Sequence, residues 1–111
     1  MKNYRINDRG VCENPDIFRA KNSIGEIEVS FCFFKSRNKW GYSVSQHIFG
    51  KSYFGSLPYE EGAEYISKQK AILAAYDYIR LSDKIHPEAP KTKIMQILAE
   101  KMQGDLFDLL K

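Results

Sequence analysis

Cysteine and histidine are the side chains that most often bind zinc, and the sequence holds Cys12, Cys32, His47 and His86. Structural zinc sites draw their ligands from closely spaced pairs, and none of these residues has such a neighbour. Neither histidine has a serine, cysteine or carboxylate in a recognisable position for nucleophilic catalysis. We therefore expect no catalytic residue, no metal and no cofactor, and interpret the chain as a binding protein rather than an enzyme.

Phosphate and acid–base chemistry are no better supported. Gly50-Lys51-Ser52 has a lysine and a serine after a glycine, but the earlier glycine of a P-loop is absent. Glu60, Glu61 and Glu64 bring carboxylates together, and a solvated run of charges explains them better than a catalytic pair.

The two cysteines and the N-terminus bear on the compartment. Met1 to Gly10 is polar and lacks the apolar core of a secretory signal peptide. We expect a cytoplasmic chain with both thiols free, while the sequence leaves a disulfide between Cys12 and Cys32 open. No apolar run approaches the roughly 20 residues that span a bilayer, so we expect no membrane partner.

Length and composition describe one small folded domain. The 111 residues suit a single domain spanning 1–111, and a hydrophobic content of 43% is enough for a core. The net charge of +3 is mild, and the basic residues are scattered among acids. This charge permits contact with nucleic acid without arguing for it.

The stretch from Glu26 to Phe49 reads as a β-hairpin. Apolar residues alternate along its first half, with Ile27, Val29, Phe31 and Phe33 on one face, as in a half-buried strand. The second half repeats the pattern, and its apolar set is Trp40, Tyr42, Val44 and Ile48. One hydrophobic face should result, and Asn38 in the intervening turn should adopt a left-handed conformation.

The hairpin tip supports a second hypothesis, that of a nucleic-acid-binding domain. Lysine and arginine neutralise phosphates, and aromatic rings stack on bases. The residues of this hypothesis are Lys35, Arg37, Lys39 and Lys51, with Tyr53 or Phe54 for stacking. The alternative is that Trp40 and Tyr42 belong to the core, since they alternate in phase with it, and that the tip charges only solvate the turn.

The segment from Gly50 to Gly62 is rich in glycine and aromatic residues, which predicts a loop. Tyr53 and Phe54 either form a contact surface for a partner or fold back over the open end of the core. The next residues, 63–66, could add a short third strand.

Two helices are expected in the C-terminal half. Ser67 is a typical N-cap for a helix over 68–81, with Ile72, Leu73, Tyr76 and Ile79 at helical spacing. A second helix over 91–103 follows Pro90, with Gly104 just past its end and a tail over 104–111. In the irregular arm over 1–25, Ile17, Phe18 and Ala20 form either a short helical turn or an edge strand. With this arm and the hairpin region over 26–66, the fold class is α+β. We expect an antiparallel hairpin or three-stranded sheet packed against two C-terminal helices.

The pentapeptide from Gln103 to Phe107 resembles the sliding-clamp-binding motif of bacterial replication and repair proteins. The resemblance implies that Gln103 hydrogen-bonds at the edge of the clamp pocket, while Leu106 and Phe107 fill its apolar subsites. The alternative is a last amphipathic turn over 105–110 that packs on the core. An apolar C-terminal helix could also pack against its twin, so a homodimer stays open.

Residues 27–81 as a whole resemble small accessory proteins of bacterial phages and conjugative elements. The resemblance rests on Trp40-Gly41-Tyr42, the glycine-rich loop and the serine-capped, alanine-rich helix over 67–79. It implies a cytoplasmic accessory or inhibitory protein that binds a bacterial protein, such as the sliding clamp or a host defence protein. Nucleic-acid binding is the runner-up function.

Overall fold

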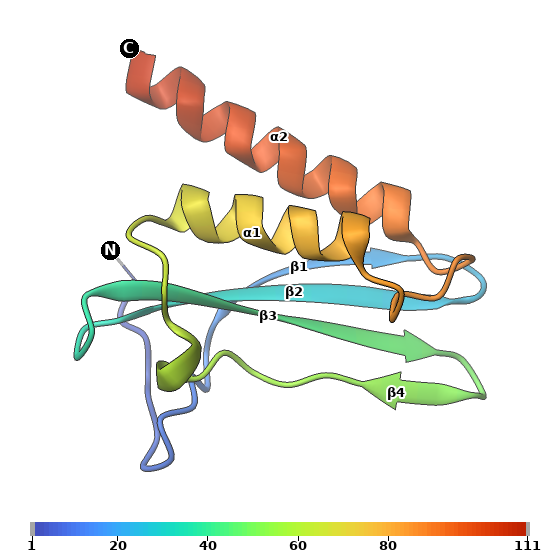
Figure 1. Ribbon diagram of the computed structural model, residues 1–111, viewed down its shortest axis with the longest axis horizontal. Coiled ribbons are helices and arrows are strands. Elements are labelled where there is room, and N and C mark those ends of the chain that lie inside the picture. The colour runs from blue at the N-terminus through green and yellow to red at the C-terminus, as the bar shows by residue number, and fades with distance from the viewer. Residues whose placement is uncertain (1, 111) are drawn as a thin grey trace.

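The computed structural model describes residues 2–110, and for residues 103–110 it describes the backbone only. The chain forms a four-stranded antiparallel sheet in the order β1-β2-β3-β4, and both C-terminal helices lie on one side of it (Figure 1). The elements are β1 (Asp16–Lys21), β2 (Gly25–Phe34), β3 (Lys39–Ile48), β4 (Ser52–Phe54), the 3-10 turn η1 (Glu60–Gly62), α1 (Lys68–Leu81) and α2 (Lys91–Leu110). The predicted α+β class is confirmed.

The central hairpin lies where the alternation predicts it. β2 and β3 pair from Gly25 opposite Ile48 to Phe34 opposite Lys39. Asn38 in the turn has a φ of 52°, the left-handed conformation expected of it.

The sheet has more strands than expected, at both edges. β1 comes from the irregular arm, where a short helical turn and an edge strand were both open, and it pairs with β2 from Asp16 opposite Phe31 to Lys21 opposite Glu26. β4 comes from the glycine-rich loop and pairs with the end of β3. The third strand suggested over 63–66 is reduced to one bridge, in which Trp40 and Tyr65 exchange backbone hydrogen bonds of 2.7 and 3.0 Å.

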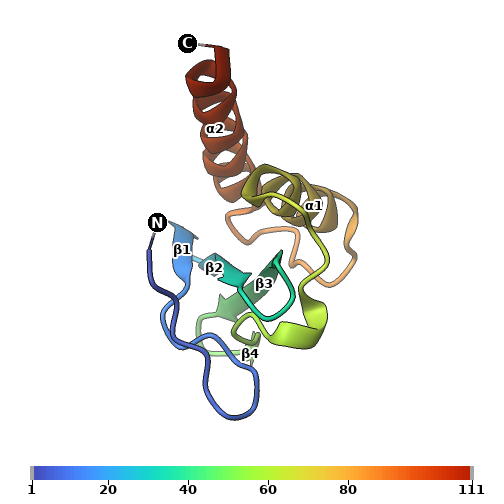
Figure 2. The same ribbon diagram turned by 90° about the vertical axis from the view of Figure 1, so that its left-hand side faces the viewer.

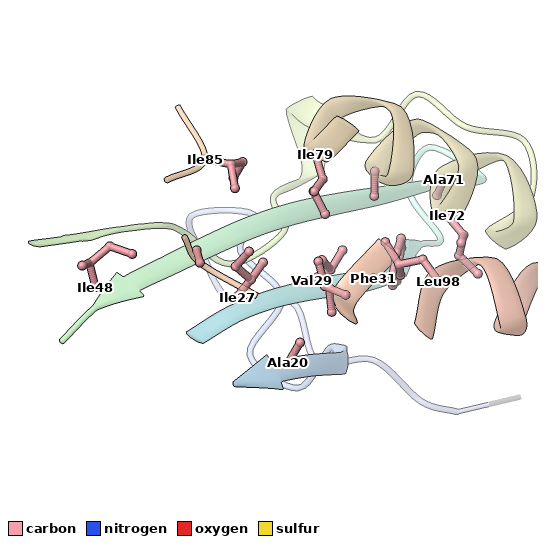
Figure 3. Close-up of a cluster of buried hydrophobic side chains, with 13 residues drawn as sticks. Ala20, Ile27, Val29, Phe31, Ile48, Ala71, Ile72, Ile79, Ile85 and Leu98 are labelled. Carbon is pink, nitrogen blue, oxygen red and sulfur yellow. The ribbon is translucent and has the colours of Figure 1, made fainter. Parts of the chain in front are cut away.

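The main core fills the space between the sheet and the two helices (Figure 3). Ile27, Val29 and Phe31 of β2 are fully buried there. The helices contribute the buried side chains of Ala71, Ile72, Ala75, Ile79, Ile94 and Leu98. Each large aliphatic side chain buried in this way stabilises the fold by about 1.5–3 kcal/mol before entropy is subtracted.

A second, smaller core lies on the opposite face of the sheet, which the single-face prediction did not include. Cys12, Cys32, Phe34 and Ala63 are buried together, with Tyr4 against them. The arm and the segment ending at Ala63 cover this end of the sheet. Cys32 and Phe34 are therefore buried, although they lie on the face of β2 that was expected to be polar. Phe33, which was expected in the main core, is only half-buried.

The two helices begin where predicted, but the second is longer. The Ser67 hydroxyl accepts a hydrogen bond of 3.1 Å from the Lys70 backbone N–H, as an N-cap does. α2 does not end at Gln103: its backbone stays helical through Gly104 to Leu110. Both views show its C-terminal end projecting beyond the rest of the fold (Figures 1 and 2). Among the described residues, no helix combines the length and apolarity needed to cross a membrane.

Adjacent positions on α1 test this packing. Ile72 is fully buried, whereas the Leu73 side chain beside it is about half exposed. Ile72→Asp should unfold the protein or destabilise it by more than about 4 kcal/mol, because an unpaired carboxylate enters the core. Leu73→Asp should cost less than about 1 kcal/mol. Urea unfolding followed by circular dichroism measures both, and equal stability of the two variants would contradict the orientation of α1.

Candidate functional site

The hairpin tip carries three of the four basic residues of the nucleic-acid hypothesis. Lys35 and Arg37 are exposed, and Lys39 is half-buried. The Ser36 hydroxyl donates a hydrogen bond of 2.9 Å to the Glu60 carboxylate, which holds η1 beside the tip. Acidic groups therefore lie close to the basic turn.

A hollow of about 230 Å³ opens beside the tip. Its lining combines two cations with two rings and one carboxylate, and consists of Lys2, Tyr4, Ile6, Phe33, Lys35, Ser36 and Glu60. Arg37 faces a different hollow, which it shares with Asp8, Glu60 and Glu61. The cations at this end are thus divided between two mixed-charge surfaces.

Asp16, at the start of β1, connects three parts of the chain behind this hollow. Its carboxylate accepts hydrogen bonds from the Tyr4 hydroxyl at 2.5 Å, the Lys68 ammonium at 2.8 Å and the Lys2 ammonium at 3.2 Å. The arm, the sheet and the first residue of α1 meet at this one side chain. The sequence carried no signal for the cluster, because its members lie far apart along the chain and combine by tertiary contact alone.

The cluster shifts the pKa of two of its members in opposite directions. Partial burial alone would raise the pKa of Asp16, but the hydrogen bonds from Lys68 and Tyr4 outweigh it and hold the pKa below its usual value. Burial, followed by the hydrogen bond to Asp16, raises the pKa of Tyr4 well above its ordinary value. Tyr4 therefore remains a protonated donor at physiological pH.

The aromatic residues of the tip are packed against one another. The Trp40 ring contacts Phe33 and Tyr4, with centroid separations of 5.5 and 5.9 Å, and the Lys68 ammonium lies 5.6 Å from its centre. Tyr42 packs on Tyr65, and its burial, with the neighbouring Tyr65, raises the pKa of Tyr42 to about 12. Both residues border the main core, as the core interpretation predicted, and are not free platforms for stacking on bases.

The remaining residues of the hypothesis lie at the other end of the sheet. Lys51 follows β3, whose 10 residues span roughly 30 Å from the tip. Tyr53 and Phe54 are neighbours in β4 and therefore face opposite sides: Tyr53 is 68% exposed, while Phe54 packs against the main core. The structure thus separates the pair proposed as a partner surface and leaves Lys51 away from the basic tip.

The sheet face opposite the helices holds a polar hollow of about 240 Å³ that sequence reasoning missed. It is lined by Glu26, Glu28, Ser45, His47 and Tyr53. Arg19 of β1 forms ion pairs with two of these carboxylates, with its Nε atom 2.7 Å from Glu28 and 3.7 Å from Glu26. The alternation of polar residues along β2 and β3 could have indicated this polar face from the sequence. Arg19 reaches the two glutamates only because β1 pairs with β2.

Both histidines make packing or hydrogen-bond contacts with their neighbours. His47 packs edge-on against Phe49 and Tyr53. The Nδ1 atom of His86 accepts a hydrogen bond from the Glu88 backbone N–H. The His86 backbone N–H donates to the buried Gln46 side chain, and this bond holds the loop between the helices on the sheet. Over residues 2–102, no three cysteine, histidine or acidic side chains are grouped as metal ligands.

The residues of the clamp-type motif lie in α2. The backbone at Gln103, Leu106 and Phe107 is helical, and the side chains lie outside the described residues. Binding of this pentapeptide as an extended segment would require the end of α2 to unwind, because its backbone is helical. Comparison with protein-family models, curated proteins and solved structures gave no match for the chain.

Asp16→Asn tests the cluster because it removes the charge and keeps the shape. The variant should be about 1–3 kcal/mol less stable at neutral pH. The lowered folded-state pKa means that Asp16 stabilises the protein above its unfolded pKa of about 4 and loses this contribution as the pH falls below that value. The gap between wild type and variant should therefore shrink as the pH falls below about 4 in urea unfolding.

Asp77→Asn is the matched control for this experiment. Asp77 is half exposed and has one ion pair, with Arg80 at 3.3 Å. The control should change stability by less than about 0.5 kcal/mol at every pH. An Asp16→Asn effect as small as that of the control would contradict the conclusion that the Asp16 carboxylate stabilises the fold.

Proposed function

We propose that this chain is a non-enzymatic accessory or inhibitory protein of phage or mobile-element type that acts by binding a bacterial protein. The proposal is carried by α2, whose 20 residues continue past the core and project from the fold (Figures 1 and 2). Ile94 and Leu98 anchor the first half of α2 in the core. In the second half, Met102 still packs against the core, and the helical backbone continues beyond it to Leu110. The proposal assigns this last part of the helix to partner binding.

The sequence of that second half suits a helix that binds in a groove. Helical spacing places positions 106, 109 and 110 on one face, and all three are leucines. Amphipathic helices bind apolar grooves through residues spaced in this way. This mode needs no unwinding, so it is the first alternative to the extended clamp-type mode within the same proposal.

A double substitution in this segment tests the proposal. Wild type, Leu106→Ala/Phe107→Ala and the control Leu73→Ala/Leu81→Ala are used to capture proteins from nuclease-treated bacterial lysate. The control removes two exposed apolar side chains from α1 instead. A partner identified by mass spectrometry should bind wild type and control equally in purified form and the α2 variant at least about tenfold more weakly.

Circular dichroism must first show that all three proteins are folded. Measurement against purified sliding clamp decides whether the clamp is the target. Equal capture by all three proteins would refute the assignment of binding to α2.

A second candidate function, nucleic-acid binding, is favoured by the hairpin tip, where Lys35 and Arg37 are exposed and Lys39 is half-buried. In this function Lys51 takes no part. The interaction would depend on phosphate neutralisation and would weaken steeply with added salt.

Two triple variants of equal net charge separate this function from general electrostatics. Lys35→Ala/Arg37→Ala/Lys39→Ala should abolish binding of a fluorescent oligonucleotide at low salt. Lys51→Ala/Lys84→Ala/Lys101→Ala, which changes exposed lysines elsewhere, should largely preserve it. Fluorescence anisotropy across a salt series measures both, and no binding by wild type at low salt removes the candidate.

A further inference from the structure

The two cysteines of the chain, widely separated in sequence, meet in the smaller core. Cys12 belongs to the N-terminal arm and Cys32 lies near the C-terminal end of β2, and neither side chain is exposed to solvent. Both belong to one buried cluster, with Phe34 and Ala63. The hydrogen bonds of the two thiols are long and weak. The Cys12 Sγ atom lies 3.8 Å from Asn14 Oδ1, and the Cys32 Sγ atom lies 3.5 Å from the Phe33 carbonyl oxygen.

The backbone at this point joins the arm to the rest of the fold. The Cys12 N–H donates a hydrogen bond of 2.9 Å to the Pro58 carbonyl, and Cys12 forms a bridge with Ile6 within the arm. Cys32 pairs across the hairpin with Gly41, where an added Cβ would lie only 3.3 Å from the Phe34 ring and 3.4 Å from the Ala63 Cα. The glycine thus lets the segment at Ala63 close over the thiol pair.

We propose that Cys12 and Cys32 form a reversible disulfide under oxidising conditions, which fastens the N-terminal arm to β2. A small-molecule disulfide such as oxidised glutathione is the oxidant. One protein thiolate attacks it, its S–S bond breaks, and one glutathione thiolate leaves. The second protein thiolate then attacks the mixed disulfide and releases the other glutathione, so two protein thiols become one disulfide while one glutathione disulfide becomes two thiols.

The closed fold slows this exchange. Burial raises the pKa of the Cys32 thiol, and the neighbouring Cys12 thiol raises it further. Only a thiolate attacks a disulfide, so exchange requires the arm to open and expose the pair. Oxidation should therefore accelerate in mild denaturant and at higher pH.

The disulfide would restrict the motion of the arm residues that line the hollow beside the hairpin tip. Lys2 and Tyr4, which line the tip hollow and bond to Asp16, lie on the same arm as Cys12. A covalent link at Cys12 restricts the arm in both the folded and the unfolded chain. We expect the oxidised protein to melt at a temperature higher by roughly 5–15 °C.

The test uses the full-length chain, incubated under native conditions with excess oxidised glutathione or with a reducing dithiol. After denaturation in an alkylating reagent, the oxidised protein should be a monomer lighter by two hydrogen atoms, with no alkylated thiol. Peptide mapping should identify a disulfide-linked pair of peptides that contain Cys12 and Cys32. Reduction should restore two alkylated thiols and the lower melting temperature.

The controls are Cys12→Ala and Cys32→Ala, which cannot form the bond and should show no rise in melting temperature on oxidation. If either control fails to fold, the wild-type peptide map still decides the question. The proposal is overturned by two free thiols at equilibrium with excess oxidant, by glutathione adducts or interchain dimers as the main products, or by an oxidised protein that melts at a lower temperature.

Discussion

The pairing of β2 with β3 is the constraint on which the other contacts depend. Side chains alternate between the faces of a strand, so a slip of one residue would move Ile27, Val29 and Phe31 from the helix side to the opposite side. The start of β2 admits no larger residue, because a Cβ at Gly25 would lie 2.3 Å from the His47 carbonyl oxygen. The fixed register then determines what α1 and α2 can pack on.

The same register gives the sheet two unequal faces. The helix side is covered along its length, so its aliphatic residues form the larger core (Figure 3). The other side is covered only near the tip, by the arm and by the segment that crosses to Ala63. Beyond that cover the sheet remains polar, with Arg19 between Glu26 and Glu28.

Asp16 joins these layers at the end where they meet. Its three donors come from the arm and from α1, so one carboxylate links segments that the sheet alone does not hold together. The thiol pair of Cys12 and Cys32 lies at the same junction, in the core beneath the arm. The proposed redox link would therefore strengthen an existing connection, whereas the proposed partner contact uses the projecting end of α2.

Local pattern was sufficient for the hairpin and for where the helices begin. Period-two alternation located β2 and β3, Asn38 supplied the left-handed turn, and Ser67 capped α1, because each of these features depends on neighbouring residues. Local pattern did not decide between a helical turn and a strand at β1, and it predicted a loop where β4 lies. Both are strands because they pair with the edges of the hairpin. Gly104 shows the same limit, since a glycine that often follows a helix lies within α2.

The candidate sites depended on tertiary structure to a greater degree. The sequence identified the basic residues and rings, but only the fold separated Lys51 from the tip and placed Tyr53 and Phe54 on opposite faces. It also brought Asp16 to Lys68 and Cys12 to Cys32. By itself, the sequence determined the α+β class, the central hairpin and the start of each helix, because these follow from residue periodicity and capping. Which side chains meet was decided by the tertiary structure alone, because contacts between distant segments depend on how the layers close.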